Sequence, residues 1–257
     1  MKKLYVTWQD KISRRWFPIG ILTHGDDGGF EFVYTEGVRE AIASSNFQPL
    51  PSFPDVNASY QSNELFPLFS NRVIPANRPD YAEFITWLGL NTQTVEPFAV
   101  LARTGGEKAT DNLQVFPCPL KTDDNQYRIQ FFAHGIRHIP GAIEKVEQLK
   151  NGDSLTLSPE PDNIVDSYAL RLLSDSSVIG YIPRYLAQDV HELLSRTKIR
   201  VEVVRLNSPP APVQFRLLCE IGAAWPQGFV PFNKPEFVPV AKVMPTHTDP
   251  NAKKASA

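Results

Sequence analysis

Proline is the residue type that most restricts the folds open to this chain, because 23 of its 257 residues are prolines. That is about 9%, compared with about 5% in an average protein. Proline breaks helix interiors and cannot pair in central strands, so a long helical bundle or a coiled coil is excluded. Apolar residues make up 42% of the chain, enough for a folded core. We therefore expect short helices and strands joined by many turns.

The first 120 residues have the pattern of a β-meander followed by short helices. Strands are predicted at 4–8, 17–22, 30–34 and 113–116, from runs rich in β-branched and aromatic residues. Helices are predicted at 36–43, 79–88 and 96–103, and an apolar turn or short helix is predicted at 65–69. Residues 48–63 are rich in proline, serine and asparagine, and this composition predicts a surface loop.

A polar stretch at 121–126 separates this region from a second region with its own alternation of strands and helices. Strands are predicted at 127–132, 154–158, 168–173, 178–182, 198–206 and 213–221, and helices at 141–149 and 184–195. Short strands around a small core predict a compact β-barrel. The predicted class is α+β, an N-terminal β-meander with short helices and then a small barrel with one or two helices. The predicted domains are 1–120 and 126–225, followed by a Pro-rich, partly flexible tail at 226–257.

Charge is distributed unevenly between the two regions. Residues 1–125 carry 11 Lys or Arg and 15 Asp or Glu, whereas residues 126–225 carry 11 of each. The net charge of −2 excludes a strongly basic protein that coats nucleic acid, but it allows a local basic groove. If a polyanion binds anywhere, the second region and the tail suit it better than the first region.

No arrangement typical of catalysis or metal binding is evident in the sequence. The five histidines are scattered, and two cysteines, Cys118 and Cys219, are too few for a disulfide framework or a zinc module. The motifs of serine hydrolases, zinc proteases and P-loop enzymes are missing. We therefore expect a protein that is not an enzyme and uses no cofactor or metal. The first ten residues lack the apolar core of a signal peptide, and no apolar run approaches 18 residues, so a cytoplasmic location without membrane contact is expected.

One pattern in the second region is specific. Its four blocks, in chain order, are Phe132–His138, Asn151–Leu157, Glu160–Leu172 and Val178–Arg184. They contain a strand that ends in a glycine, a glycine before an apolar strand, a Glu-Pro-x-Asn-x-x-Asp core and a Gly-Tyr-Ile-Pro-Arg segment. Over residues 126–225 this pattern resembles the HIRAN domain, a module fused to helicase-like DNA remodellers and also found alone in bacteria.

The resemblance implies a small β-barrel that binds DNA, in the best-studied relatives the 3′ end of a single strand. Arg137 and His138 occupy the positions of an Arg–aromatic pair that meets phosphate and a base. Asn163 and Asp166 match the polar pair that holds the terminal nucleotide. The last two matching positions, which form the wall after the barrel glycine, are Tyr181 and Arg184.

The sequence departs from the family pattern in its aromatic residues. The eukaryotic pattern has aromatics where this chain has His138 and Val165. Stacking contributes about 1–3 kcal/mol per base, so the loss of one stacking surface lowers the expected affinity. Asn163 and Asp166 also suit a simpler role, because their side chains are natural turn formers that hold their own loop.

The first region resembles, more loosely, the N-terminal subdomain of HipA-type toxin kinases, over about residues 1–118. The matching segments are Phe17–Leu22, Phe30–Tyr34, Gln48–Pro54, Leu65–Pro75, Trp87–Leu90 and Pro97–Gly106. The kinase core that follows in those proteins is replaced by the HIRAN-like region. In split toxin–antitoxin systems of this type, the free N-terminal piece binds and restrains the kinase, so the resemblance implies a docking domain at 1–120.

Two functions follow from these resemblances. The first is a non-enzymatic adaptor whose HIRAN-like domain binds single-stranded DNA or DNA ends while residues 1–120 bind a protein. The alternative is a protein-interaction subunit, an antitoxin-like partner of a HipA-type kinase, with little nucleic-acid binding. A hydrolase or nuclease is a third hypothesis, for which no metal-binding cluster is evident in the sequence.

Overall fold

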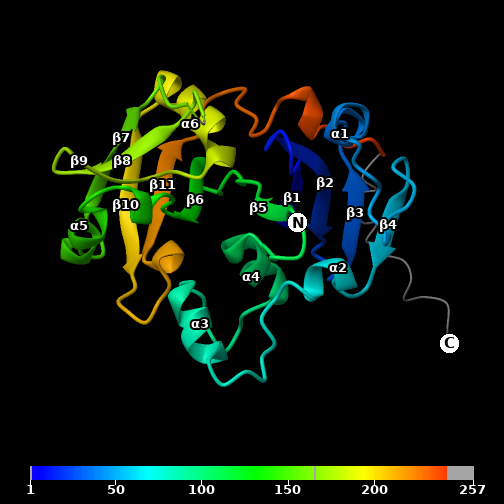
Figure 1. Ribbon diagram of the computed structural model, residues 1–257, viewed down its shortest axis with the longest axis horizontal. Helices are drawn as coiled ribbons and strands as arrows, with labels where there is room; N and C mark the ends of the chain where they lie inside the picture. The colour runs from blue at the N-terminus through cyan, green and yellow to red at the C-terminus, as the bar shows by residue number, and fades with distance from the viewer. Residues whose placement is uncertain (1, 165, 242–257) are drawn as a thin grey trace. The chain divides into compact units, whose positions relative to one another are not determined.

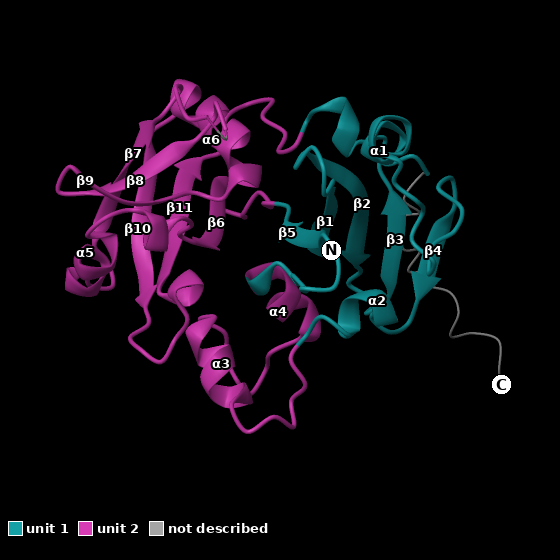
Figure 2. Ribbon diagram, in the orientation of Figure 1, with its two compact units in different colours: residues 1–73, 104–118, 233–257 teal, residues 74–103, 119–232 magenta. Residues whose placement is uncertain are grey.

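The computed structural model describes residues 2–164 and 166–241, which form two compact units (Figure 2). The first unit contains the residues up to 73, residues 104–118 and the residues from 233 onward. The second unit contains residues 74–103 and 119–232. Both units combine antiparallel strands with short helices, so the predicted α+β class is confirmed.

The first unit is built on a five-stranded antiparallel sheet with the order β4-β3-β2-β1-β5 (Figure 1). Its strands are β1 (Lys2–Gln9), β2 (Trp16–His24), β3 (Phe30–Tyr34), β4 (Ser59–Ser62) and β5 (Leu113–Pro117). Its helical segments are α1 (Gly37–Ser45), α2 (Pro67–Ser70) and the 3-10 helix η3 (Pro235–Phe237). The meander expected at 2–34 is therefore present as β1, β2 and β3.

The segment at 48–63 differs from the predicted surface loop. It contains the short strand β4, and it is tied into the core by aromatic contacts. The ring of Phe53 is buried and stacks on that of Phe32 with 4.1 Å between centroids. The hydroxyl of Tyr34 donates to the Phe53 carbonyl at 2.8 Å and accepts from the Leu50 amide at the same distance. Polar composition predicted exposure here, but the few aromatic and aliphatic side chains decide how the segment packs.

The second unit is built on a six-stranded antiparallel sheet with the order β6-β11-β10-β7-β8-β9. Its strands are β6 (Gln126–Phe132), β7 (Ser154–Pro159), β8 (Leu170–Ser174), β9 (Ser177–Tyr181), β10 (Ile199–Leu206) and β11 (Leu217–Ala224). Its helices are α3 (Tyr81–Trp87), α4 (Pro97–Thr104), α5 (Ala142–Gln148) and α6 (Arg184–Arg196), with 3-10 turns η1 (Ile136–His138) and η2 (Val213–Phe215).

The sheet of the second unit is not the closed barrel that was predicted, because β6 and β9 are its two edge strands. The chain leaves β6 at Phe132 and turns into η1 before a regular ladder with β9 can form. An isolated bridge joins His134 to Tyr181, the last residue of β9, through two backbone hydrogen bonds of 2.9 Å. The turn after β6 is thereby held against β9, at the place where the candidate site lies.

Residues 74–103 belong to the second unit, although the sequence placed them in a domain ending at 120. Within that unit, the ring of Phe84 on α3 meets that of Phe215 edge-on, with 5.7 Å between centroids. Arg205 and Asn207 also donate hydrogen bonds to main-chain carbonyls at the end of α3, at 3.0 and 2.7 Å. Helical periodicity predicted the buried face of α3 but carried no information about its partner, which lies more than 100 residues away in the chain.

The segment predicted as a tail from 226 onward is partly ordered. Phe229 is buried, and its ring packs edge-on against that of Trp225 with 5.3 Å between centroids. Further on, Phe237 packs edge-on against Tyr5 of the first unit's sheet, and Pro239 forms a bridge with Thr35. The predicted tail therefore packs as far as residue 241, and the remainder lies outside the described residues.

Candidate nucleic-acid interface

The six residues predicted to contact DNA come from three segments of the second unit. Asn163 and Asp166 lie in the loop at 160–169, which connects β7 to β8. Tyr181 ends β9, and Arg184 is the first residue of α6. Arg137 and His138 lie in η1. Val165, where the family pattern has an aromatic residue, falls outside the described residues.

The loop at 160–169 is held by Glu160, the first residue of the third sequence block, for which no role was predicted. Its carboxylate forms an ion pair with Arg171 on β8 and accepts a hydrogen bond of 2.8 Å from the side-chain amide of Asn163. The hydroxyl of Tyr181 is a further hydrogen-bond partner of this carboxylate. Arg171 and Tyr181 are opposite each other in the β8–β9 ladder, so the register of two strands delivers both partners to Glu160.

These contacts determine the protonation states of Glu160 and Tyr181 at neutral pH. The Arg171 guanidinium, followed by the amide of Asn163, lowers the pKa of Glu160 from 4.5 to about 2. Burial and the hydrogen bond to Glu160 raise the pKa of Tyr181 above its usual value of 10. At neutral pH, Glu160 is therefore a carboxylate and Tyr181 a neutral donor. Both groups are committed to holding the loop, and neither has a pKa suited to acid–base catalysis at neutral pH.

Asp166 and Asn163 stabilise the same loop by accepting hydrogen bonds from its own backbone amides. The side-chain oxygen of Asn163 accepts from the backbone amide of Asp166 at 3.1 Å, and Asp166 accepts from the amide of Tyr168 at 3.0 Å. This is the turn-forming role that the residue types favour. The second carboxylate oxygen of Asp166 lies 3.5 Å from Nε of Arg184, whose side chain is 55% exposed. The contact is long and half solvated, so Arg184 can also bind an incoming anion.

The turn with Arg137 and His138 is placed by close packing of backbone on β9. Gly135 has φ +75°, and a Cβ atom there would lie 3.1 Å from the Tyr181 ring. A Cβ atom on Gly180 would lie 3.0 Å from the carbonyl oxygen of His134. The two glycines therefore allow an approach that side chains would obstruct. Arg137 and His138 follow directly, both exposed, and Nε of Arg137 donates to Nε2 of His138 at 3.2 Å.

The outer surface of the loop carries exposed apolar side chains. Ile164 is fully exposed, and Tyr168 is 45% exposed. His191 on α6 donates through Nε2 to the carbonyl of Tyr168 at 3.1 Å, and the two rings meet edge-on. The loop is therefore attached to α6 through both Tyr168 and Asp166, and it presents an aromatic ring that the sequence analysis missed.

Four predicted residues, Asn163, Asp166, Tyr181 and Arg184, are thus brought together by direct contacts, with Glu160 and Arg171 as their supports. Arg137 and His138 stand in the neighbouring turn and reach the group through the backbone bridge at Tyr181. Alternation along β8 could have indicated that Arg171 faces out of the core. Its pairing with Glu160 depends on strand register, which the pattern does not fix.

Comparison with known families identifies this region. Residues 126–223 match the model of the HIRAN domain family. The chain therefore contains a HIRAN domain at these residues, and the resemblance inferred from the four sequence blocks is confirmed there. The match does not extend to residues 1–118, so their resemblance to HipA-type kinases stays a prediction.

Two solved structures resemble parts of the chain. One is a protein from Lactobacillus plantarum, with 18% identity and a TM-score of 0.32, covering 38% of this chain and 96% of that one. The other is the HIRAN domain of human HLTF, with 14% identity and a TM-score of 0.28, covering 40% of this chain and 79% of that one. No curated protein was found to match the chain.

Among residues 2–164 and 166–241, no three His, Cys, Asp or Glu side chains are grouped so that they could hold a metal ion. In the same residues, every helix is too short or too polar to cross a bilayer.

Proposed function

We propose that the HIRAN domain of this chain binds single-stranded DNA, with preference for a free 3′ end, at the surface formed by the 160–169 loop, η1 and the start of α6. In this proposal the protein binds DNA without catalysing a reaction, and it is located in the cytoplasm. The observation that carries it is the pair of exposed arginines, Arg137 and Arg184, placed beside a loop that is held by part-buried contacts of Glu160 and Asn163.

The chemistry of this surface suits a strand end. The two guanidinium groups can pair with phosphates by charge-assisted hydrogen bonds. The ring of His138 and the half-exposed ring of Tyr168 offer faces on which bases can stack. Asp166 can accept a hydrogen bond from a terminal sugar hydroxyl if Arg184 turns from the carboxylate to a phosphate. Apart from this movement of the Arg184 side chain, the groups are already in position, so little ordering of the protein is required.

The test is a fluorescence-anisotropy titration of the full chain with a labelled single strand that has a free 3′ hydroxyl. A second strand, blocked by a 3′ phosphate, and a blunt duplex serve as comparisons. We expect the free 3′ end to bind most tightly. Engagement of two or three phosphates predicts a slope of log K against log salt of about −1.4 to −2. Absence of binding at low salt by a protein that is folded by circular dichroism would overturn the proposal.

We further propose that residues 1–120 dock a protein, which would make the chain an adaptor. The supporting observation is the acidic balance of residues 1–125, with 15 acidic and 11 basic side chains, which disfavours DNA on this part of the chain. A near-stoichiometric partner that co-purifies from the native host supports docking. If the DNA titration fails and such a partner is a HipA-type kinase, the alternative of an antitoxin-like subunit replaces the adaptor.

A further inference from the structure

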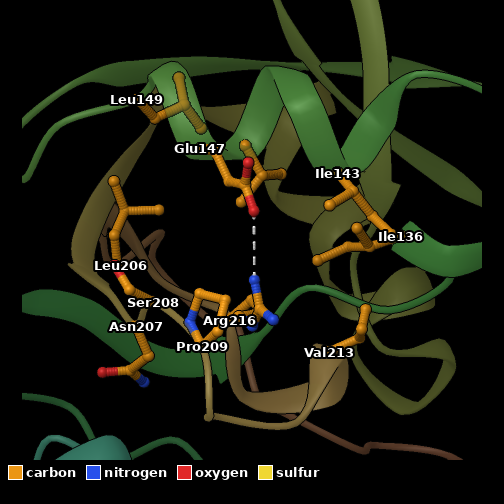
Figure 3. A pocket seen from close by; sticks show the side chains of 11 residues that line it. Ile136, Ile143, Glu147, Leu149, Leu206, Asn207, Ser208, Pro209, Val213 and Arg216 are labelled. Carbon is orange, nitrogen blue, oxygen red and sulfur yellow. Dashed lines mark hydrogen bonds and ion pairs between the residues drawn. The ribbon is translucent and has the colours of Figure 1, made fainter.

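The second unit contains a cavity of about 620 Å³ that is separate from the residues assigned to DNA. It lies between α5, η1, η2 and the connection that follows β10 (Figure 3). Its apolar lining residues are Ile136, Ile143, Val146, Leu149, Leu206, Pro209 and Val213. A volume of this size falls within the range of cavities that hold small organic ligands, about 300–1,000 Å³.

Two charged side chains face each other across this cavity. Arg216 and Glu147 approach to 3.4 Å, and Figure 3 shows the pair at the centre of the apolar lining. They are the charged residues among those that line it in the described part of the chain. The polar remainder of the lining is Asn207, whose amide donates to the carbonyls of Trp87 and Phe215, and Ser208.

The two members of the ion pair differ in how firmly they are held. The side chain of Arg216 is only 15% exposed, and its Nε donates to the carbonyl of Ala211 at 2.7 Å. The side chain of Glu147 is 53% exposed and extends from the surface of α5. A contact of 3.4 Å with a half-exposed partner contributes little to stability. Glu147 can therefore move into solvent while Arg216 stays, and the cavity then presents a fixed cation surrounded by aliphatic side chains.

We propose that this cavity binds a small monocarboxylate with an aliphatic body, whose carboxylate replaces that of Glu147 on Arg216. The aliphatic chain contacts the isoleucine, valine and leucine side chains, and Glu147 becomes fully hydrated. A cationic ligand would have to be held by the half-exposed carboxylate of Glu147, and it would place a second positive charge beside the largely buried Arg216. The geometry therefore selects an anion.

The cavity is connected to the proposed DNA surface through one turn of chain. Ile136, which lines the cavity, begins η1, and the next two residues are Arg137 and His138. A ligand that contacts Ile136 is thus one residue away from the side chains proposed to meet DNA. This proximity offers a readout in DNA binding, but the carboxylate site does not depend on the proposed function.

The test uses the full chain and measures binding of octanoate by calorimetry, with octanol and octylamine as probes of the same length. We expect octanoate to bind at least about tenfold more tightly than either probe, the difference typical of a charge-assisted hydrogen bond. Arg216→Gln should remove this preference. If octanol binds as well as octanoate, or if none of the three binds, the proposal is wrong.

A second variant tests the proposal with Arg216 left in place, because Arg216 also donates a hydrogen bond to the carbonyl of Ala211 and its loss can disturb the fold. Glu147→Gln removes only the exposed competitor, and it should tighten octanoate binding by about threefold or more. The matched control is Glu144→Gln, which removes an exposed carboxylate from the same helix without touching the cavity lining. Equal octanoate affinity in the two variants would contradict displacement of Glu147. Because no DNA is present in these titrations, the outcome is independent of the DNA proposal.

Discussion

Single side chains at the candidate interface fall into two groups with different physical roles. Glu160, Arg171, Asn163 and Tyr181 satisfy one another and hold the 160–169 loop. Arg137, His138 and Arg184 are exposed and are held by weaker contacts, at 3.2 Å to a neighbouring ring nitrogen or 3.5 Å to a half-solvated carboxylate. Changes in the first group should affect stability, whereas changes in the second should affect binding.

The exposed group is tested by Arg137→Ala. We expect it to weaken binding of a single strand by about 1.5–3 kcal/mol, the contribution of a charge-assisted hydrogen bond, without lowering the melting temperature. The measurement is anisotropy at fixed low salt, with circular dichroism for the fold. Arg39→Ala on α1 is the control, since it also removes an exposed cation, but from the other unit. A similar loss in both variants would show that net charge, and not this surface, sets the affinity.

The supporting group is tested by the pH dependence of stability in Glu160→Gln. The pKa of Glu160 is lowered from 4.5 to about 2 in the folded protein, so its ionised contacts stabilise the fold fully above about pH 4.5. That contribution decreases as the pH falls from about 4.5 toward about 2. We expect the variant to melt at a lower temperature than the wild type at pH 7, with a gap that narrows over this range. A gap that is independent of pH between 7 and 3 would contradict the assigned ion pair.

At the scale of secondary-structure elements, the decisive feature is the approach of the turn after β6 to β9. The bridge between His134 and Tyr181 and the two glycines beside it bring η1 to the end of the edge strand. The HIRAN domain thereby places its two proposed arginines on neighbouring segments without a complete barrel ladder.

The glycine substitutions Gly135→Ala and Gly141→Ala separate packing from backbone strain. The two positions have φ +75° and φ +74°, so an alanine at either position lowers the stability by a similar amount, about 1 kcal/mol, through backbone strain. Only at Gly135 would the new Cβ atom meet a neighbour, the Tyr181 ring at 3.1 Å; at Gly141 there is no atom within 4 Å. We expect Gly135→Ala to be less stable by about 1 kcal/mol more, from overpacking, and to bind DNA more weakly. Equal denaturation midpoints would show that the contact carries no strain.

The elements themselves follow closely from local patterns in the sequence. Alternation in β3 and helical spacing in α6 predicted both elements within a few residues. Barrel closure was not predictable, because it depends on the register between β6 and β9, which are about 50 residues apart in the chain. The same limit applies to the site: residue types at 163 and 166 favoured a turn, but the pairing of Glu160 with Arg171 and Tyr181 arises from the ladder of β8 and β9.

At the scale of the whole molecule, the main observation is that neither unit is a continuous piece of chain. The first unit collects three segments, and the second collects two. A HIRAN domain defined by its family match, 126–223, therefore lacks α3 and α4, which belong to the same compact unit.

This division leads to a prediction for isolated fragments. A fragment of residues 120–232 should melt at a lower temperature than one of residues 74–232 in which a Gly-Ser linker replaces 104–118. The reason is that the ring of Phe84 on α3 packs against that of Phe215, and that Gly89, just after α3, is so near Leu218 that a Cβ atom on it would lie 2.9 Å from the leucine side chain. Thermal unfolding followed by circular dichroism measures the difference. Melting at the same temperature would mean that 74–103 adds no stability, and the domain would then be independent from about residue 126, as the sequence suggested.

The path of the chain also determines how the protein responds to a protease. The backbone passes from one unit to the other four times, near residues 73, 103, 118 and 232. A single cut near residue 74 leaves β1 and β5 on two different fragments. The two strands pair in one antiparallel ladder, so backbone hydrogen bonds still hold the fragments together. The nicked molecule should therefore elute from a gel-filtration column at its original volume and separate into two bands only after denaturation. A cut at this position therefore leaves the size of the native molecule unchanged. The regions proposed to bind DNA and to bind a protein stay physically linked after it.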